Sequence, residues 1–129
     1  MFKSLFARRP AYDPHEPWQS EYEVPIPRQL VILRPKAPSL QWVKQIDPDT
    51  TFTLAKLRAD AIAYLVPMGE GDAVEAKAFV CAHYGRFFAQ ELANWTTDTN
   101  LWPTERSLVL FRRWFDIEIL DMVFDVADA

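Results

Sequence analysis

Two short apolar runs, each ended by a proline, constrain the fold of this chain more than any other feature. They are QLVILRP at residues 29–35 and AIAYLVP at residues 61–67. Such a run is typical of a buried strand, and its proline lacks the backbone donor that would continue the pairing. The sequence therefore predicts strands at 29–34 and 61–67.

Two short helices are predicted between these strands, in APSLQWVKQIDPDTTFTLAKLRAD. Ser39 is a candidate N-cap for the first helix, because its hydroxyl can accept from a free amide of the first turn. Pro48 then interrupts the chain, and Thr51 or Thr53 is the candidate N-cap of the second helix.

The segment 72–94 carries the clearest helical pattern, with Asp72 as its expected N-cap. At roughly 100° per residue, apolar and polar side chains separate onto two sides. The apolar side holds Val74, Ala78, Cys81, Phe88, Leu92 and Trp95. The polar side holds Asp72, Glu75, His83, Arg86, Gln90 and Asn94. We expect one amphipathic helix, with Trp95 continuing its buried side.

A second main helix is expected over 104–115, beginning after Pro103. Leu108, Phe111 and Phe115 repeat at helical spacing on its buried side, and Trp114 lies away from them.

The segment 117–126 has two interpretations. Its apolar residues alternate with Asp121 and Asp125, as in a half-buried strand. A helical spacing through Ile119, Met122 and Val126 would instead extend the preceding helix. The content of β-branched and aromatic residues favours the strand.

These elements predict one α+β domain over 29–129, with the strands at 29–34, 61–67 and 117–126 in a small three-stranded sheet. The sheet is expected to be antiparallel or mixed, and to pack against the two main helices, 72–94 and 104–115, on one face.

Residues 1–28 are expected to form an extended, proline-rich arm. Its prolines are Pro10, Pro14, Pro17, Pro25 and Pro27. Its aromatic residues are Phe2, Phe6, Tyr12, Trp18 and Tyr22. This aromatic content is high for a disordered tail, so we expect part of the arm to dock, either on its own domain or on a partner.

Charge and cysteine content exclude several classes of protein. The formal charge is −4, and acidic and basic residues are interspersed, so we expect no nucleic-acid partner. Cys81 is the single cysteine and forms no internal disulfide. No apolar run reaches the roughly 18 residues of a membrane span, and none of signal-peptide length follows MFKSLFARRP. We therefore expect a cytoplasmic protein without membrane contact.

No motif in the chain predicts catalysis, a cofactor or a metal. Gly69 and Gly71 follow the second strand as in a phosphate-binding turn, but Val74 occupies the third glycine position. Glu70 and Asp72 would also place negative charge where phosphates bind. The glycines are therefore interpreted as a strand-to-helix turn.

Other reactive residues also lack a suitable partner. His15, His83 and Cys81 have no zinc-ligand spacing, and no serine lies in a nucleophile turn. The acidic residues of the C-terminal segment are Glu118, Asp121, Asp125 and Asp128. On a strand, Asp121 and Asp125 lie roughly 13 Å apart, so we interpret these carboxylates as a solvated face.

Exposed aromatic and arginine side chains remain as candidate binding residues. Phe79 falls on the polar side of the first main helix, with His83 and Arg86 about one and two turns along, and Trp102 stands near Arg106. Such residues anchor protein interfaces. Two structural alternatives stay open, in which Trp102 staples a helix start and Phe79 belongs to the core.

The stretches YLVP, FFAQELANW and LWPTERSLVLFRRWFDIEILDMVFDV form an aromatic pattern, W…WP…R…F..WF. Over about residues 61–126 this pattern resembles a group of small uncharacterised bacterial proteins. The resemblance implies a bacterial cytoplasmic origin and a strand–helix–helix–strand order. It implies no activity and no catalytic residues.

We therefore expect a non-enzymatic interaction or regulatory protein with a protein partner, including a second copy in a homodimer. The alternative is a small-molecule-binding or catalytic domain with a pocket between the main helices and the sheet, lined by Trp102, Arg106, Arg112 or His83. An interaction protein should expose a flat apolar patch of several hundred Å². A ligand-binding domain should enclose a cavity of roughly 300 Å³ or more with converging polar groups.

Overall fold

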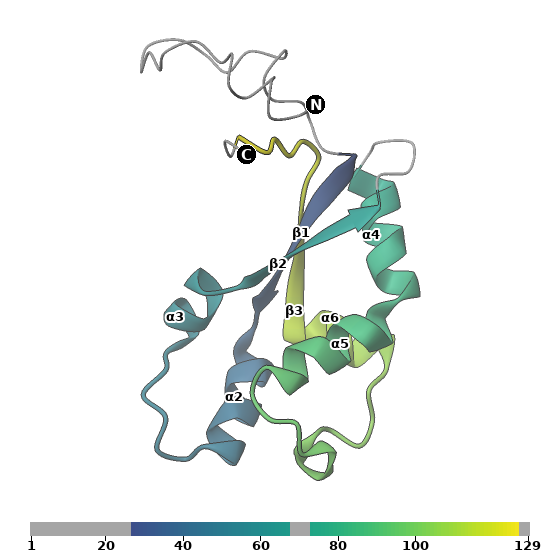
Figure 1. Ribbon diagram of the computed structural model, residues 1–129. Coiled ribbons are helices and arrows are strands. Elements are labelled where there is room, and N and C mark those ends of the chain that lie inside the picture. The colour runs from purple at the N-terminus through teal and green to yellow at the C-terminus, as the bar shows by residue number, and fades with distance from the viewer. Residues whose placement is uncertain (1–26, 68–72, 127–129) are drawn as a thin grey trace, which may run out of the picture.

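The computed structural model describes residues 27–67 and 73–126, and its centre is a three-stranded antiparallel sheet in the order β2-β1-β3 (Figure 1). The strands are β1 (Arg28–Pro35), β2 (Ile62–Pro67) and β3 (Phe115–Leu120). The α+β class and the predicted three-stranded sheet are confirmed. The third strand begins two residues earlier than predicted and ends at Leu120, six residues before the predicted end.

Residues 1–26, 68–72 and 127–129 lie outside the described residues. The proline-rich arm, the turn at Gly69 and Gly71, the cap at Asp72 and the carboxylate of Asp128 therefore stay predictions, as does the division of the chain into an arm and a domain.

The strand β1 divides the sheet into two faces with opposite surroundings. Val31 pairs with Tyr64 and Ile119, and Leu33 pairs with Ile62 and Ile117, so these side chains share one face. Val31 and Leu33 are fully buried there against residues of the helices. Within the described residues, the α-helices that follow β2 contribute the core that covers this face, and the other face is left uncovered except where Arg34 contacts the end of the helix before β2.

Two short helices, α2 (Ala37–Ile46) and α3 (Leu54–Ala59), connect β1 to β2. Thr53 is the N-cap of α3, because its Oγ1 accepts from the Lys56 amide at 3.1 Å. The expected cap at Ser39 is wrong: α2 begins at Ala37 with Lys36 at the cap position, and Ser39 is buried inside the first turn. Pro38 in the first turn suits this earlier start, because its missing amide needs no partner there.

The single helix predicted over 72–94 is wrong, because the chain forms two helices, α4 (Ala73–Ala82) and α5 (Tyr84–Ala93), that meet at His83. The buried residues form a row at four-residue spacing, Ala76 and Val80 in α4 and Phe88 and Leu92 in α5. Over these 16 residues such a row drifts about 160° around a straight helix. With the chain broken at His83, the buried residues of both helices belong to the core that covers the sheet.

The predicted buried side of this segment is right only in its second half. Phe88 and Leu92 are buried as expected, and Cys81 is half-buried. Val74 is 75% exposed and Trp95 is 38% exposed, which contradicts the expectation for both. Trp95 follows the end of α5, and its ring packs edge-on against Phe52 instead of the core.

The second main helix, α6 (Leu108–Trp114), is shorter than the predicted 104–115. Ser107 sets its start, because Oγ accepts from the Leu110 amide at 3.1 Å, while a short 3-10 helix, η1 (Thr99–Leu101), precedes it. Trp114 was expected away from the buried side, yet it is buried at the end of α6. The helix ends there, so the chain turns Trp114 toward the core as β3 begins.

Aromatic rings fill the space between the helices and the sheet. The Phe88 ring lies 5.6 Å from Phe111, 5.4 Å from Trp114 and 5.9 Å from Phe115, measured between centroids. Trp42 of α2 extends the cluster, with its centroid 5.9 Å from that of Trp114. Phe88 is therefore the residue through which α5, α6 and β3 pack together.

We predict that Phe88→Ala lowers the free energy of unfolding by about 3–5 kcal/mol, because it removes a fully buried ring and leaves a cavity. Urea unfolding followed by circular dichroism measures this loss. The control is Val109→Ala in α6, where the side chain is 61% exposed and the change should stay within about 0.5 kcal/mol. Equal stability of the two variants would contradict the central position of Phe88.

Candidate functional site

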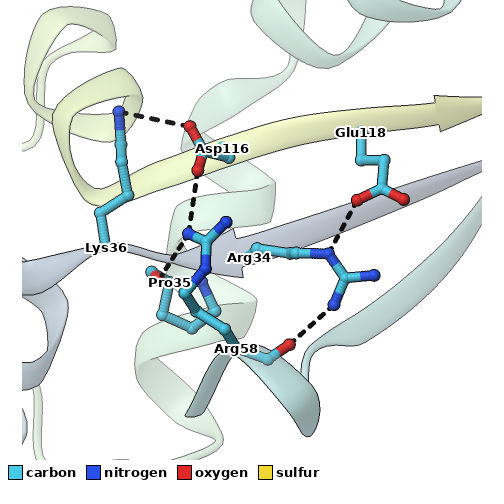
Figure 2. A network of polar contacts seen from close by, with 6 residues as sticks. All are labelled: Arg34, Pro35, Lys36, Arg58, Asp116 and Glu118. Carbon is cyan, nitrogen blue, oxygen red and sulfur yellow. Dashed lines mark hydrogen bonds and ion pairs between the residues drawn. The ribbon is translucent and has the colours of Figure 1, made fainter. Parts of the chain in front are cut away.

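The uncovered face of the sheet is charged at one end, as Figure 2 shows. Arg34 donates from Nε to Glu118 Oε2 at 2.7 Å and from Nη1 to the Arg58 carbonyl at 2.7 Å. Arg58 Nη1 donates to Asp116 Oδ2 at 2.9 Å, and Lys36 Nζ lies 3.7 Å from Asp116 Oδ1. This network joins the end of α3 to β1 and β3, so we interpret it as structural.

The other end of this face is apolar. Leu30 of β1 pairs with Leu65 of β2 and with Leu120 of β3, so three leucines form one row across the sheet, here called the leucine row. Leu65 is 55% exposed and Leu120 is 44% exposed. The exposed side chains of Met122, Phe124 and Val126 follow Leu120 in the chain. The uncovered face therefore changes from charged to apolar along the strands.

Three of the predicted binding residues line one cleft. Phe79, His83 and Arg86 meet at the break between α4 and α5, around a cavity of about 300 Å³. The other lining residues are Tyr64, Phe87 and Gln90. The Phe79 ring is half-buried against the core and lies 4.4 Å from the His83 ring. Arg86 is exposed and binds no carboxylate among the described residues.

The other two predicted residues lie elsewhere. The Arg106 guanidinium carbon lies 5.6 Å from the Trp102 ring centroid, and Trp102 Nε1 donates to the Thr96 carbonyl at 2.9 Å. Trp102 lines a cavity of about 340 Å³ with Trp42 and Trp114, but Arg106 does not. His83 and Arg112 line two further cavities. Trp102, His83 and Arg112 therefore each line a different cavity among the described residues.

Glu118 of β3 and Asp121, which follows the strand, have separate partners. Glu118 binds Arg34, and the Arg34 guanidinium lowers the pKa of the Glu118 carboxyl. Asp121 Oδ1 accepts from Nε2 of the fully buried Gln29 at 3.1 Å. No group of three or more possible metal ligands occurs in residues 27–67 and 73–126.

The structure reveals a buried acid that the sequence analysis did not single out. Glu91 of α5 is 7% exposed, and the Tyr64 hydroxyl of β2 donates to its Oε2 at 2.5 Å. Burial raises the pKa of Glu91 to about 7, although the hydrogen bond from Tyr64 opposes this rise. Burial and then the hydrogen bond to Glu91 raise the pKa of Tyr64. Glu91 stands three residues after Phe88 and next to Leu92. This position on the buried side of the helix was the sequence signal that could have identified it as a buried acid.

Comparison of the chain with protein-family models, curated protein sequences and solved structures finds no match. The resemblance to small bacterial proteins stays a prediction. Among the described helices, none combines the length and the apolar character that a bilayer span requires.

The Tyr64–Glu91 pair predicts a specific dependence of stability on pH. Glu91 keeps its proton to about pH 7 in the folded protein and loses it at the ordinary value of 4.5 after unfolding. The folded form binds more protons between these values, so ionisation of Glu91 lowers stability as the pH rises. We predict that the stability of Glu91→Gln relative to the natural protein increases by roughly 2–3 kcal/mol between about pH 5 and pH 8.

Urea unfolding at several pH values measures this difference. Glu118→Gln is the matched control, because the pKa of Glu118 is lowered by Arg34. A lowered pKa places the titration of Glu118 below 4.5, so the Glu118→Gln difference should stay constant between pH 5 and pH 8. A Glu91→Gln difference that is constant from pH 5 to pH 8 would contradict the raised pKa.

Proposed function

We propose that this protein is a non-enzymatic interaction protein whose uncovered sheet face binds a second copy of the same chain. The leucine row at the apolar end of that face, with Leu65 and Leu120 exposed, supports the proposal most directly. An isolated exposed leucine needs no explanation, but three leucines side by side across a sheet are a contiguous apolar surface.

The apolar residues and the rim of this surface suit an interface. The leucine row exposes apolar side chains, and the exposed Met122, Phe124 and Val126 follow it in the chain. Adjacent exposed apolar residues of this kind often mark an interaction site. A rim of charged residues borders the row through Arg34 and Glu118 on one side and Arg28 on the other. An apolar centre with a polar rim is the usual anatomy of a protein interface.

A second copy fits this face because the face complements itself. A two-fold axis between the copies that runs across the strands places each leucine over its counterpart. It also carries the two networks around Arg34 to opposite ends. Arg28 of each copy then lies over the row that Ile32, Ala63 and Glu118 form in the other copy. Arg28 is exposed and has no carboxylate partner among the described residues, so this arrangement pairs opposite charges.

Cytoplasmic location and bacterial origin belong to the same proposal. The single cysteine, which gives no internal disulfide, supports a reducing compartment. The resemblance of residues 61–126 to small bacterial proteins supports the origin.

We predict that the full chain is a dimer and that Leu65→Glu weakens its association at least about tenfold, because it places an unpaired charge in the apolar centre. Light scattering over a concentration series measures the mass, and circular dichroism checks the fold. Val109→Glu is the matched control, since Val109 is similarly exposed but belongs to α6 on the other face of the sheet. It should associate as the natural chain does.

Charge pairs test the axis itself. A mixture of Leu65→Glu and Leu65→Lys should restore association if the axis runs across the strands, because the two substituted side chains then meet. Association that is unaffected by Leu65→Glu, or a monomer at every concentration, would contradict the proposed dimer. If a chain shortened to begin at Glu23 dimerises while the full chain is a monomer, the occupant of the face is the chain's own N-terminal segment.

A further inference from the structure

A cavity not yet described lies beside the carboxylate of Glu91 and has the chemistry of a cation site. It has a volume of about 160 Å³ and lies between α3, the start of β2 and the end of α5. The lining residues that matter are Phe52, Leu57, Asp60, Ile62, Glu91 and Trp95. We refer to it as the Glu91 cavity. No lysine, arginine or histidine is among its lining residues.

We propose that the Glu91 cavity binds an alkylammonium group, a positively charged amine on a short aliphatic stem, with Glu91 as its counter-ion. This binding uses side chains of the helix-covered part of the molecule and does not depend on association through the uncovered sheet face.

The carboxylate of Glu91 is only half satisfied within the protein. Tyr64 donates to Oε2, and none of the described residues donates to Oε1. Glu91 as a whole is 7% exposed, while Oε1 itself is not fully enclosed and keeps contact with solvent. Buried carboxylates in proteins are normally paired with a cation or fully hydrogen-bonded, because removal of their charge from water is costly. A bound ammonium group supplies both the missing charge and the missing donors.

The remaining groups around the cavity also favour a cation. Asp60 adds a second carboxylate, which Lys56 partly neutralises from the surface at 3.0 Å. Asn94 and Trp95 line the cavity directly after the last residue of α5, where the helix dipole presents its negative end. The two carboxylates and the helix C-terminus therefore give this cavity a negative character, and no cationic side chain lines it.

The walls suit an aliphatic stem. The rings of Phe52 and Trp95 pack edge to face with centroids 5.5 Å apart, and the buried Leu57 and half-buried Ile62 also line the cavity. Aromatic faces attract cations, and apolar walls shield the short stem from water. Both rings are 38% exposed, so the cavity stays accessible from solvent.

The test is a titration of the full chain with n-butylammonium chloride at about pH 8, followed by the nuclear magnetic resonance signal of the Trp95 indole. A Trp95→Phe variant assigns that signal. We expect butylammonium to bind saturably. Neutral 1-butanol and anionic butyrate should bind at least about tenfold more weakly. The four-carbon stem matches the lysine side chain.

Variants separate the role of charge from that of packing. Glu91→Gln keeps the shape and an acceptor for Tyr64, and it should weaken butylammonium about tenfold while leaving 1-butanol unchanged. Phe52→Leu removes an aromatic face without touching Glu91 and should also weaken butylammonium. Glu118→Gln, which removes a carboxylate on the uncovered face, should have no effect.

The pH dependence gives a further readout. Butylammonium stays charged below pH 8, as lysine does. Its affinity should fall from about pH 8 to pH 5.5, because burial raises the pKa of Glu91 to about 7 and a protonated Glu91 carries no charge. Of the other groups facing Glu91, Tyr64 has its pKa raised further from this range, and Asp60 remains paired with Lys56. Glu91→Gln should show no such fall.

The source of the ammonium group is distinguished by a second probe, Nα-acetyl-lysine amide. Binding of this blocked lysine as tightly as butylammonium would assign the cavity to a lysine side chain of a protein. Its exclusion would assign the cavity to a free amine. Equal affinity for butylammonium and 1-butanol, an unchanged affinity in Glu91→Gln, or no saturable binding would overturn the proposal.

Discussion

The structure depends on the burial of one face of β1. This strand pairs with both β2 and β3, so its backbone is satisfied on both sides and its alternate side chains determine what each face must contact. Val31 and Leu33 are fully buried, and helices have to cover them. The two helices that meet at His83 both contribute to this cover, with Ala76 and Val80 from α4 and Phe88 and Leu92 from α5.

Local patterns in the sequence predicted the strands well and the helix limits poorly. The apolar runs ended by Pro35 and Pro67 are local signals, and strands form at both of them. The continuous helical pattern of 72–94 gave no sign of the break at His83, where α4 ends and α5 begins. Residues 104–107 also suited a helix, yet the capping bond of Ser107 starts α6 later.

The candidate residues show the same division between local and distant contacts. Phe79 and His83 are four residues apart, as are Trp102 and Arg106, and both pairs are in contact. Sequence spacing was sufficient to place each pair together, because residues at this spacing are neighbours in a helix or a tight turn. Tyr64 and Glu91 are separated by 27 residues and come from different elements. Their contact follows from the packing of α5 on β2, which no local pattern encodes.

The edge strand β2 contributes to both proposed sites, because its successive side chains point to opposite faces of the sheet. Tyr64 points to the helix-covered face, where it holds Glu91, and the next residue, Leu65, points to the uncovered face within the leucine row. Neighbouring residues of one strand therefore serve surfaces on opposite sides of the sheet. A substitution at Leu65 alters one side chain without moving Tyr64, so association and cation binding can be separated by mutation. Physical coupling between them would require a shift of the β2 backbone, and its pairing with β1 along the whole strand opposes such a shift.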